Sequence, residues 1–168
     1  MEQGKLKLKG KYRFRCFSPD GKLLWEDTIE NIVVNTGLTF ALNVILGSQA
    51  KMGAWYIGLT DSAPTVAATD TIASHPGWTE VVAYEEDTRQ GLNVANTVNQ
   101  SITNAATPAR FIVNADSTVI GGAFVVSNNA KNGAAGTLFS VAAFSSGDKT
   151  VNNGETLEVD YTLAASDA

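Results

Sequence analysis

The chain has 168 residues, only 17% of them charged, and a formal net charge of −5. Its one cysteine, Cys16, excludes an intrachain disulfide and a cysteine-built metal site, and we expect a buried structural thiol. No segment approaches the roughly 18 consecutive apolar residues of a membrane span, and the N-terminus lacks the apolar block of a secretory signal. We therefore expect a protein without a membrane partner that is made and folded in a cytoplasm.

The N-terminal segment alternates charged and apolar residues from Lys5 to Phe17, which is typical of a strand with one buried face. Gly10 interrupts the alternation and predicts a bulge. The bulge would divide the outward basic positions into two rows, which are Lys5, Lys7 and Lys9, then Lys11, Arg13 and Arg15. A turn at 18–21, followed by residues 22–27 and 32–34, predicts that the chain returns as a long hairpin.

Charge is unevenly distributed along the chain. Residues 1–25 carry seven basic and two acidic groups, a net of +5, whereas five basic and fifteen acidic groups give the remainder a net of −10. A basic element on an acidic body indicates docking onto an acidic surface and disfavours nucleic acid, because the body would repel phosphates. The competing interpretation is a strand with one solvated face, on which lysine also prevents edge-to-edge pairing.

Residues 35–46 predict the one helix of the chain. Asn35 offers a cap, Gly47 ends the pattern, and Leu38, Ala41, Leu42 and Ile45 recur at helical spacing. We expect this apolar face to pack against a sheet as a structural element.

Two aromatic-rich segments, 54–60 and 78–84, predict central strands joined by a long loop at 61–77. Long ordered loops in compact domains tend to be functional, so His75 and Trp78 are candidate contact residues. Three acidic residues at 85–87 follow, and we expect a solvated turn or an intersubunit contact, because neighbouring strand residues point to opposite faces.

The C-terminal half adds further strands. Residues 118–127 form an apolar run in which Gly121 and Gly122 predict a bend or a close backbone approach, and 137–144 and 156–163 follow. About ten strands and one helix predict an all-β (mainly β) fold, a β-sandwich with Greek-key or jelly-roll-like connections. We expect one domain over residues 1–168, with a basic N-terminal strand or arm at about 1–17.

No motif for catalysis, cofactor binding or metal binding emerges from the sequence. His75 is the only histidine, and neither a nucleophile elbow nor a phosphate-binding loop is present. A carboxylate pair for glycoside hydrolysis stays open, because the separation of two carboxylates is a tertiary property. We expect a non-enzymatic protein without a cofactor.

Several segments taken together in order resemble a family of tailed-bacteriophage virion structural proteins. They are 30–38, 55–59, 73–80, 84–89, 101–104, 122–129 and 153–161. The capsid decoration (cement) proteins of short-tailed phages are the most similar group, and they have jelly-roll-like bodies that bind the outer face of the shell.

The resemblance implies a virion protein on the capsid exterior that has the major capsid protein as its partner. It transfers no catalytic residue. We further expect a homo-oligomer, a dimer in preference to a trimer at local three-folds, since two-fold dimers are the commonest closed assembly. The basic positions 5–15 are then the candidate capsid-docking residues. The alternative is a tail, neck or receptor- or glycan-binding component, for which Trp78 and Tyr84 would be exposed aromatic candidates. The competing interpretation, which we favour for both residues, is packing in the core.

Overall fold

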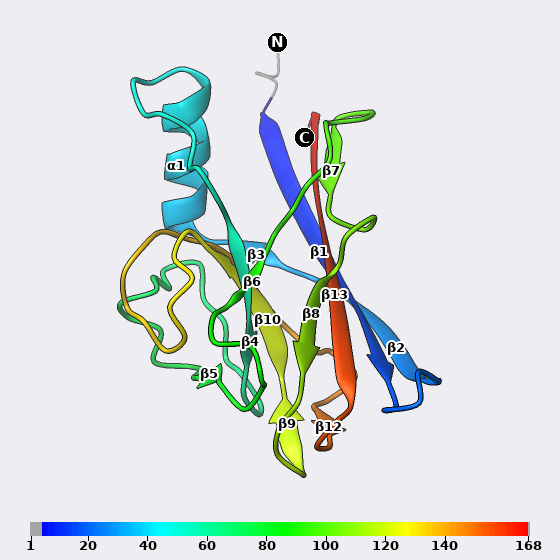
Figure 1. The fold of residues 1–168 in the computed structure, drawn as a ribbon. Helices are drawn as coiled ribbons and strands as arrows, with labels where there is room; N and C mark the ends of the chain where they lie inside the picture. The colour runs from blue at the N-terminus through cyan, green and yellow to red at the C-terminus, as the bar shows by residue number, and fades with distance from the viewer. Residues whose placement is uncertain (1–4, 168) are drawn as a thin grey trace.

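The computed structural model describes residues 5–167 and is mainly β, with two large antiparallel sheets that pack face to face (Figure 1). The first sheet contains β2 (Leu23–Glu30), β1 (Leu6–Phe17), β13 (Thr156–Asp167), β7 (Ser101–Thr103) and β8 (Ala109–Ile112). The second contains β3 (Ile32–Val33), β11 (Leu138–Ala143), β10 (Gly122–Val126), β4 (Tyr56–Thr60), β5 (Glu80–Val81) and β6 (Gln90–Gly91). The prediction of an all-β sandwich is confirmed.

Two smaller elements complete the fold. The short strands β9 (Thr118–Ile120) and β12 (Lys149–Val151) pair at one end of the sandwich. The helix α1 (Asn35–Ile45) lies at the other end, where the start of β1 and the end of β13 extend past the body (Figure 1). Strands from the beginning and the end of the chain, β1 and β13, are neighbours in the first sheet. The chain passes between the two sheets several times, because strands that follow one another in sequence, such as β2 and β3, belong to different sheets.

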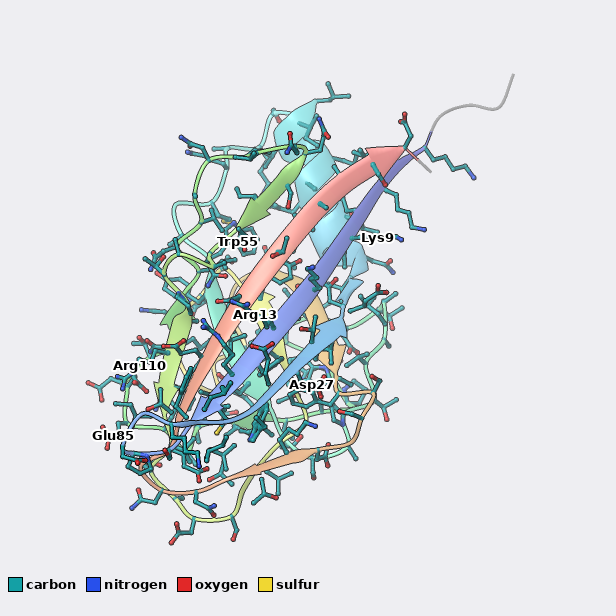
Figure 2. The ribbon with its side chains drawn as sticks, turned by 90° about the vertical axis from the view of Figure 1, so that its right-hand side faces the viewer. Lys9, Arg13, Asp27, Trp55, Glu85 and Arg110 are labelled. Atoms are coloured by element: carbon teal, nitrogen blue, oxygen red, sulfur yellow. The ribbon has the colours of Figure 1, made fainter. Side chains whose placement is uncertain are left out.

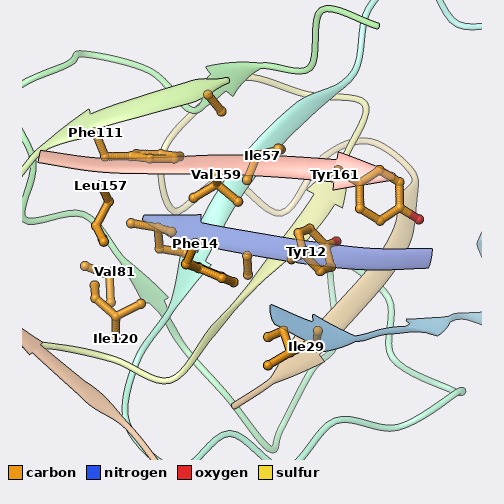
Figure 3. Close-up of a cluster of buried hydrophobic side chains, with 14 of the residues drawn as sticks. Tyr12, Phe14, Ile29, Ile57, Val81, Phe111, Ile120, Leu157, Val159 and Tyr161 are labelled. Atoms are coloured by element: carbon orange, nitrogen blue, oxygen red, sulfur yellow. The ribbon is translucent and has the colours of Figure 1, made fainter. Parts of the chain in front are cut away.

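The main core fills the space between the two sheets (Figure 3). Tyr12 and Phe14 of β1 and Val159 of β13 point inward from the first sheet and meet Ile57 and Leu59 of β4 from the second. The Tyr12 hydroxyl lies 2.7 Å from the Ser140 hydroxyl, which joins the sheets by a buried hydrogen bond. The period-two alternation in β1 and β13 therefore predicts this core correctly.

A second core covers the opposite face of β10, because the loop 61–77 folds back over it. Ile72 and Trp78 pack there against Phe124 and Val126, and the Trp78 indole lies 5.0 Å from the Phe124 ring. All five residues of β10 are buried for this reason. A strand covered on both faces reads as a continuous apolar run, as this one does.

Three expectations about the strands are wrong. Residues 32–34 do not continue the hairpin, because β3 leaves the first sheet and pairs with β11 of the second. The segment 78–84 forms only the two-residue strand β5, with an isolated bridge at Tyr84. Gly10 makes no bulge, since β1 and β13 stay in register from Leu6 to Phe17.

A close approach of two side chains favours glycine at position 10. A β-carbon there would lie 2.5 Å from the Tyr161 hydroxyl and 2.6 Å from the Asn31 side-chain oxygen. The predicted close approach at Gly121 and Gly122 is confirmed, because β-carbons would lie 2.0 Å from the Asp61 carbonyl oxygen and 1.9 Å from that of Ala142. The chain also changes sheet at this glycine pair.

The helix packs with a different face from the expected one. Gly37 and Phe40 are its buried residues, whereas Leu38, Leu42 and Ile45 are 39%, 58% and 57% exposed. Val34 takes the cap position, and no side chain caps the helix. The prediction that the leucine face packs against a sheet is therefore wrong.

Candidate docking surface

The basic residues of β1 lie on the outer face of the first sheet (Figure 2). Because β1 runs without a bulge, its odd-numbered positions share one side. The two rows expected from the sequence are therefore one continuous row on β1, which consists of Lys7, Lys9, Lys11, Arg13 and Arg15. Lys5 immediately precedes the strand.

The two arginines are held by acidic partners on β13. Arg13 donates through Nε to Asp160 Oδ2 at 2.7 Å, and the Arg15 guanidinium lies 3.0 Å from Glu158 and 3.8 Å from Asp160. The Asp160 side chain is only 5% exposed, so the arginines neutralise a nearly buried carboxylate. Arg13 and Arg15 thus join β1 to β13, and their charge is largely cancelled for an approaching partner.

The same sheet face continues this pairing of opposite charges. Across four neighbouring strands, Glu26, Arg15, Glu158 and Arg110 occupy adjacent register positions, so that acidic and basic residues alternate. Opposite charges on directly facing strand positions stabilise a sheet, whereas like charges would destabilise it. The positive and negative charges on this face therefore balance around Arg15 and Glu158.

The lysines at the start of β1 lie in different surroundings. The strand β2 pairs with β1 only from Lys11 onward, so Lys7 and Lys9 lie beyond its end. On the other side they face Ser166 and Ala164 of β13. Within residues 5–167 no carboxylate lies within 4.0 Å of the ammonium groups of Lys5, Lys7 or Lys9, and all three residues are exposed. We call these three residues the lysine row.

The lysine row also lies on an open strand edge. The Gly10 carbonyl oxygen accepts a hydrogen bond from the Asn31 backbone N–H at 3.1 Å, and β2 does not extend along the strand before that point. Lysine on such an edge discourages pairing with other chains, so edge protection and docking remain two roles for the same side chains.

The loop candidates are placed differently from each other. Trp78 is 4% exposed, and its indole Nε1–H donates to Asp70 Oδ2 at 3.0 Å. The expectation that Trp78 contacts a partner is wrong, because this side chain seals the second core. His75 is half-buried, stacks on Trp78 with ring centroids 3.7 Å apart, and has Nδ1 2.8 Å from the Trp78 carbonyl oxygen.

Tyr84 does not serve as an exposed aromatic either. Its ring is 1% exposed, packs edge-on against Phe111, and lies under the Lys131 ammonium group at 3.8 Å from the ring centroid. Burial, together with the charge of Glu80, raises the pKa of Tyr84. Trp78 and Tyr84 therefore pack in the cores, and neither can stack on a glycan.

A buried ion pair holds the loops beside the second core. Arg89 donates to both carboxylate oxygens of Glu80, at 2.9 Å and 2.7 Å, and to the carbonyl oxygens of Asn128 and Gly133. Both side chains are nearly inaccessible, at 0% and 3% exposure. A guanidinium with this many acceptors ties three segments together and has little capacity left for an external anion.

Features that could support chemistry are few in this part of the chain. Within residues 5–167 no three His, Cys, Asp or Glu side chains gather as a metal site, and no helix there has the length and apolar character that a membrane crossing requires. Burial, and then the nearby charge of Glu155, raises the pKa of the Cys16 thiol to about 12. The thiol is therefore protonated at neutral pH, as expected for a structural cysteine.

One open hollow of about 290 Å³ lies beside α1. Its lining is uncharged and consists of Asn35, Thr36, Thr39, Phe40, Asn43, Gln49 and Thr137. A smaller hollow of about 120 Å³ lies over the Glu80–Arg89 pair and includes His75. Neither hollow adjoins the lysine row.

No match was found among protein-family models, curated proteins or solved structures. The assignment of a function therefore depends on the exposed lysine row and on the family resemblance of the seven sequence segments given above.

Sequence reasoning found all six basic residues but missed the partners that neutralise two of them. The last strand alternates Glu158 and Asp160 with apolar residues, in the same period as the basic residues of the first strand. This complementary charge period is a signal that the two strands pair, and it could have separated the arginines from the lysine row.

Proposed function

We propose that the protein is a non-enzymatic structural component of a phage virion that binds the outer capsid surface and stabilises the shell. The observation that carries the proposal is the lysine row, which presents three exposed ammonium groups without acidic partners among residues 5–167, on a chain with a net charge of −5. The resemblance to capsid decoration proteins of seven segments, which occur in the same order along the chain, also supports it. The partner is the major capsid protein, and the location is the virion exterior after synthesis in the host cytoplasm.

Weak contacts suffice for this role. An exposed lysine–carboxylate pair contributes about 0–1 kcal/mol, so one copy binds through these lysines only modestly. Repetition over a lattice and binding to the assembled shell alone shift the equilibrium away from disassembly. The charged row also orients the protein, because electrostatic complementarity fixes the register of docking.

Two matched double variants test the docking surface. Lys7→Gln with Lys9→Gln removes two charges from the lysine row, and Lys22→Gln with Lys51→Gln removes two from other exposed positions. We expect the first variant to show reduced and less salt-sensitive occupancy on purified capsids, and the second to behave as wild type. Lys5→Gln added to the first should lower occupancy further. Equal occupancy and equal salt dependence in all variants would overturn docking through the lysine row.

The stabilising role has its own test. Particles stripped of this protein should release DNA at a lower temperature than complete particles, and restoring the protein should restore the original temperature. Identical release temperatures would contradict a cement function, whatever the docking face.

A second candidate is a tail, neck or receptor-binding component that binds a neutral glycan. The observation in its favour is the hollow beside α1, which amide and hydroxyl side chains line together with Phe40. These uncharged groups would bind the hydroxyl groups of a glycan by hydrogen bonds. Copy number in purified particles separates the two candidates, because a cement protein approaches the capsid protein in abundance and a tail component does not.

A further inference from the structure

We infer that the exposed leucine face of α1 is the surface through which two copies of this chain associate. The inference concerns the isolated protein and does not depend on where in the virion the protein lies. It names the surface that would form a homodimer. The sequence alone predicts a homodimer but not which surface forms it.

The surface is a continuous stripe along one flank of the helix. Leu38, Leu42 and Ile45 are spaced i, i+4 and i+7, so their side chains lie in one line. They are 39%, 58% and 57% exposed, and Leu46 at the end of the helix is 90% exposed. We call the first three residues the apolar stripe. Single exposed leucines are common on protein surfaces, whereas these three side chains form one contiguous apolar surface.

The body of the protein fixes the orientation of this stripe. A β-carbon on Gly37 would lie 2.3 Å from the Phe139 carbonyl oxygen, so glycine lets α1 approach the backbone of β11 closely at this point. Phe40 packs edge-on against Trp55 with ring centroids 5.2 Å apart. These two contacts set the rotation of the helix and leave the apolar stripe on its flank, where residues 5–167 do not cover it.

The charge distribution favours a second copy as the occupant. Residues 31–50 contain no charged side chain, although the chain as a whole is 17% charged. In a two-fold contact the same surface faces itself, so any charge near the axis would meet its own copy and repel it. A different partner recognised by charge would find no group to pair with on this segment. An uncharged apolar stripe is compatible with itself.

The size of the surface sets the expected strength. An 11-residue helix is about 16 Å long, and its stripe with Leu46 exposes the equivalent of roughly two and a half leucine-sized side chains. This supplies the apolar centre of a contact but is small beside the about 800 Å² that each partner buries in a standard interface. We therefore expect a dimer with a micromolar dissociation constant, which association with a lattice would reinforce.

Two substitutions on the same helix provide the test. Leu42→Glu places a charge at the centre of the apolar stripe, whereas Asn43→Glu places the same charge on the polar flank that lines the hollow. Sedimentation equilibrium between about 1 and 100 µM should show dimers for wild type and Asn43→Glu, and monomers for Leu42→Glu. Both positions are exposed, and circular dichroism melting checks that each variant keeps the wild-type fold.

A charge-reversal mixture identifies the partner as a second copy. Leu42→Lys alone should also be monomeric, but an equimolar mixture of Leu42→Lys and Leu42→Glu should recover dimers, because opposite charges then meet at the two-fold. A monomeric wild type at 100 µM would overturn the inference, as would a dimer that Leu42→Glu leaves intact. If the wild type is monomeric and Leu42→Glu no longer binds capsids, the apolar stripe contacts the capsid protein instead of a second copy.

Discussion

The two halves of β1 have the same alternating pattern and different surroundings. In the half next to β2, Arg13 and Arg15 face Asp160 and Glu158 and join two strands. In the half beyond β2, Lys7 and Lys9 face Ser166 and Ala164 and have no carboxylate within 4.0 Å among residues 5–167. The comparison shows that a basic row on a strand acquires its role from the neighbouring strands and not from its own sequence.

A fully buried ion pair, Glu80–Arg89, extends the comparison of paired and unpaired charges. We expect the largest loss of stability when this pair is broken. Glu80→Gln leaves the Arg89 guanidinium buried beside a neutral amide, and breaking a buried pair in this way costs about 3–5 kcal/mol. Urea unfolding should show a loss of this size. The double variant Glu80→Leu with Arg89→Met should recover part of it, since no uncompensated charge remains. A single variant as stable as wild type would contradict the structural role of the pair.

The stability of the protein at alkaline pH tests the burial of the tyrosine hydroxyls in the main core. Burial raises the pKa of Tyr161 to about 12, and burial and the neighbouring Tyr161 raise the pKa of Tyr12. Below pH 10 both states of the protein hold these protons, so stability does not depend on them. Between about pH 10 and 12 the unfolded chain loses the Tyr161 proton and the folded chain keeps it, so this one group lowers stability by about 1.4 kcal/mol per pH unit. The raised pKa of Tyr12 makes the fall steeper.

Urea unfolding at several pH values measures this slope. Tyr161→Phe should have a shallower slope over the same range, because one ionising group is gone from the unfolded state. An unchanged slope would contradict a contribution of Tyr161 burial to the alkaline loss of stability.

The paired half of β1 should lose an intermediate amount of stability. Asp160→Asn keeps the shape of the side chain but removes the charge that faces Arg13, whose own side chain is 41% exposed. Hydrogen bonds to charged groups contribute about 1.5–3 kcal/mol, and solvent screening reduces this to about 1–2 kcal/mol here. Thermal and urea unfolding measure the loss. A change below about 0.5 kcal/mol would place Arg13 with the unpaired cations.

The smallest effect is expected in the lysine row. Lys7→Gln with Lys9→Gln should change the free energy of unfolding by less than about 0.5 kcal/mol, because neither residue has a partner to lose among residues 5–167. Size-exclusion chromatography of the same variant tests edge protection, since aggregation at unchanged stability would show that the lysines shield the strand edge. A large loss of stability would contradict the contrast between the two halves.

The local pattern of the sequence predicted much of the fold. The alternation predicted the inward residues correctly over Tyr12–Cys16 of β1 and at Leu157, Val159 and Tyr161 of β13. Leu6 at the start of β1 is 57% exposed, and the outward-facing Asp160 is buried. The turn at 18–21 forms as expected, with Gly21 at a φ of +84°. The pair Gly121 and Gly122 marks a change of sheet. These features follow from residue type and period, which act over a few neighbouring residues.

Other features depend on contacts between distant segments, and the sequence did not determine them. The loop 61–77 has the composition of a surface loop, yet it covers β10 because Trp78 and Ile72 fill a second core. Glycine is favoured at position 10 because Tyr161, from the far end of the chain, and Asn31 occupy the space where a side chain would stand. Neither contact has a local signature.

The sequence by itself determined that a basic first strand, one amphipathic helix and an acidic body would be present in this protein. The tertiary structure decided which of the basic residues are neutralised and which face of the helix is covered. The physical reason is that period fixes which side chains share a face, whereas long-range pairing fixes what that face meets. The close approach of Gly37 to β11 turned the leucines of α1 outward, and the acidic positions of β13 separated the arginines of β1 from its lysines.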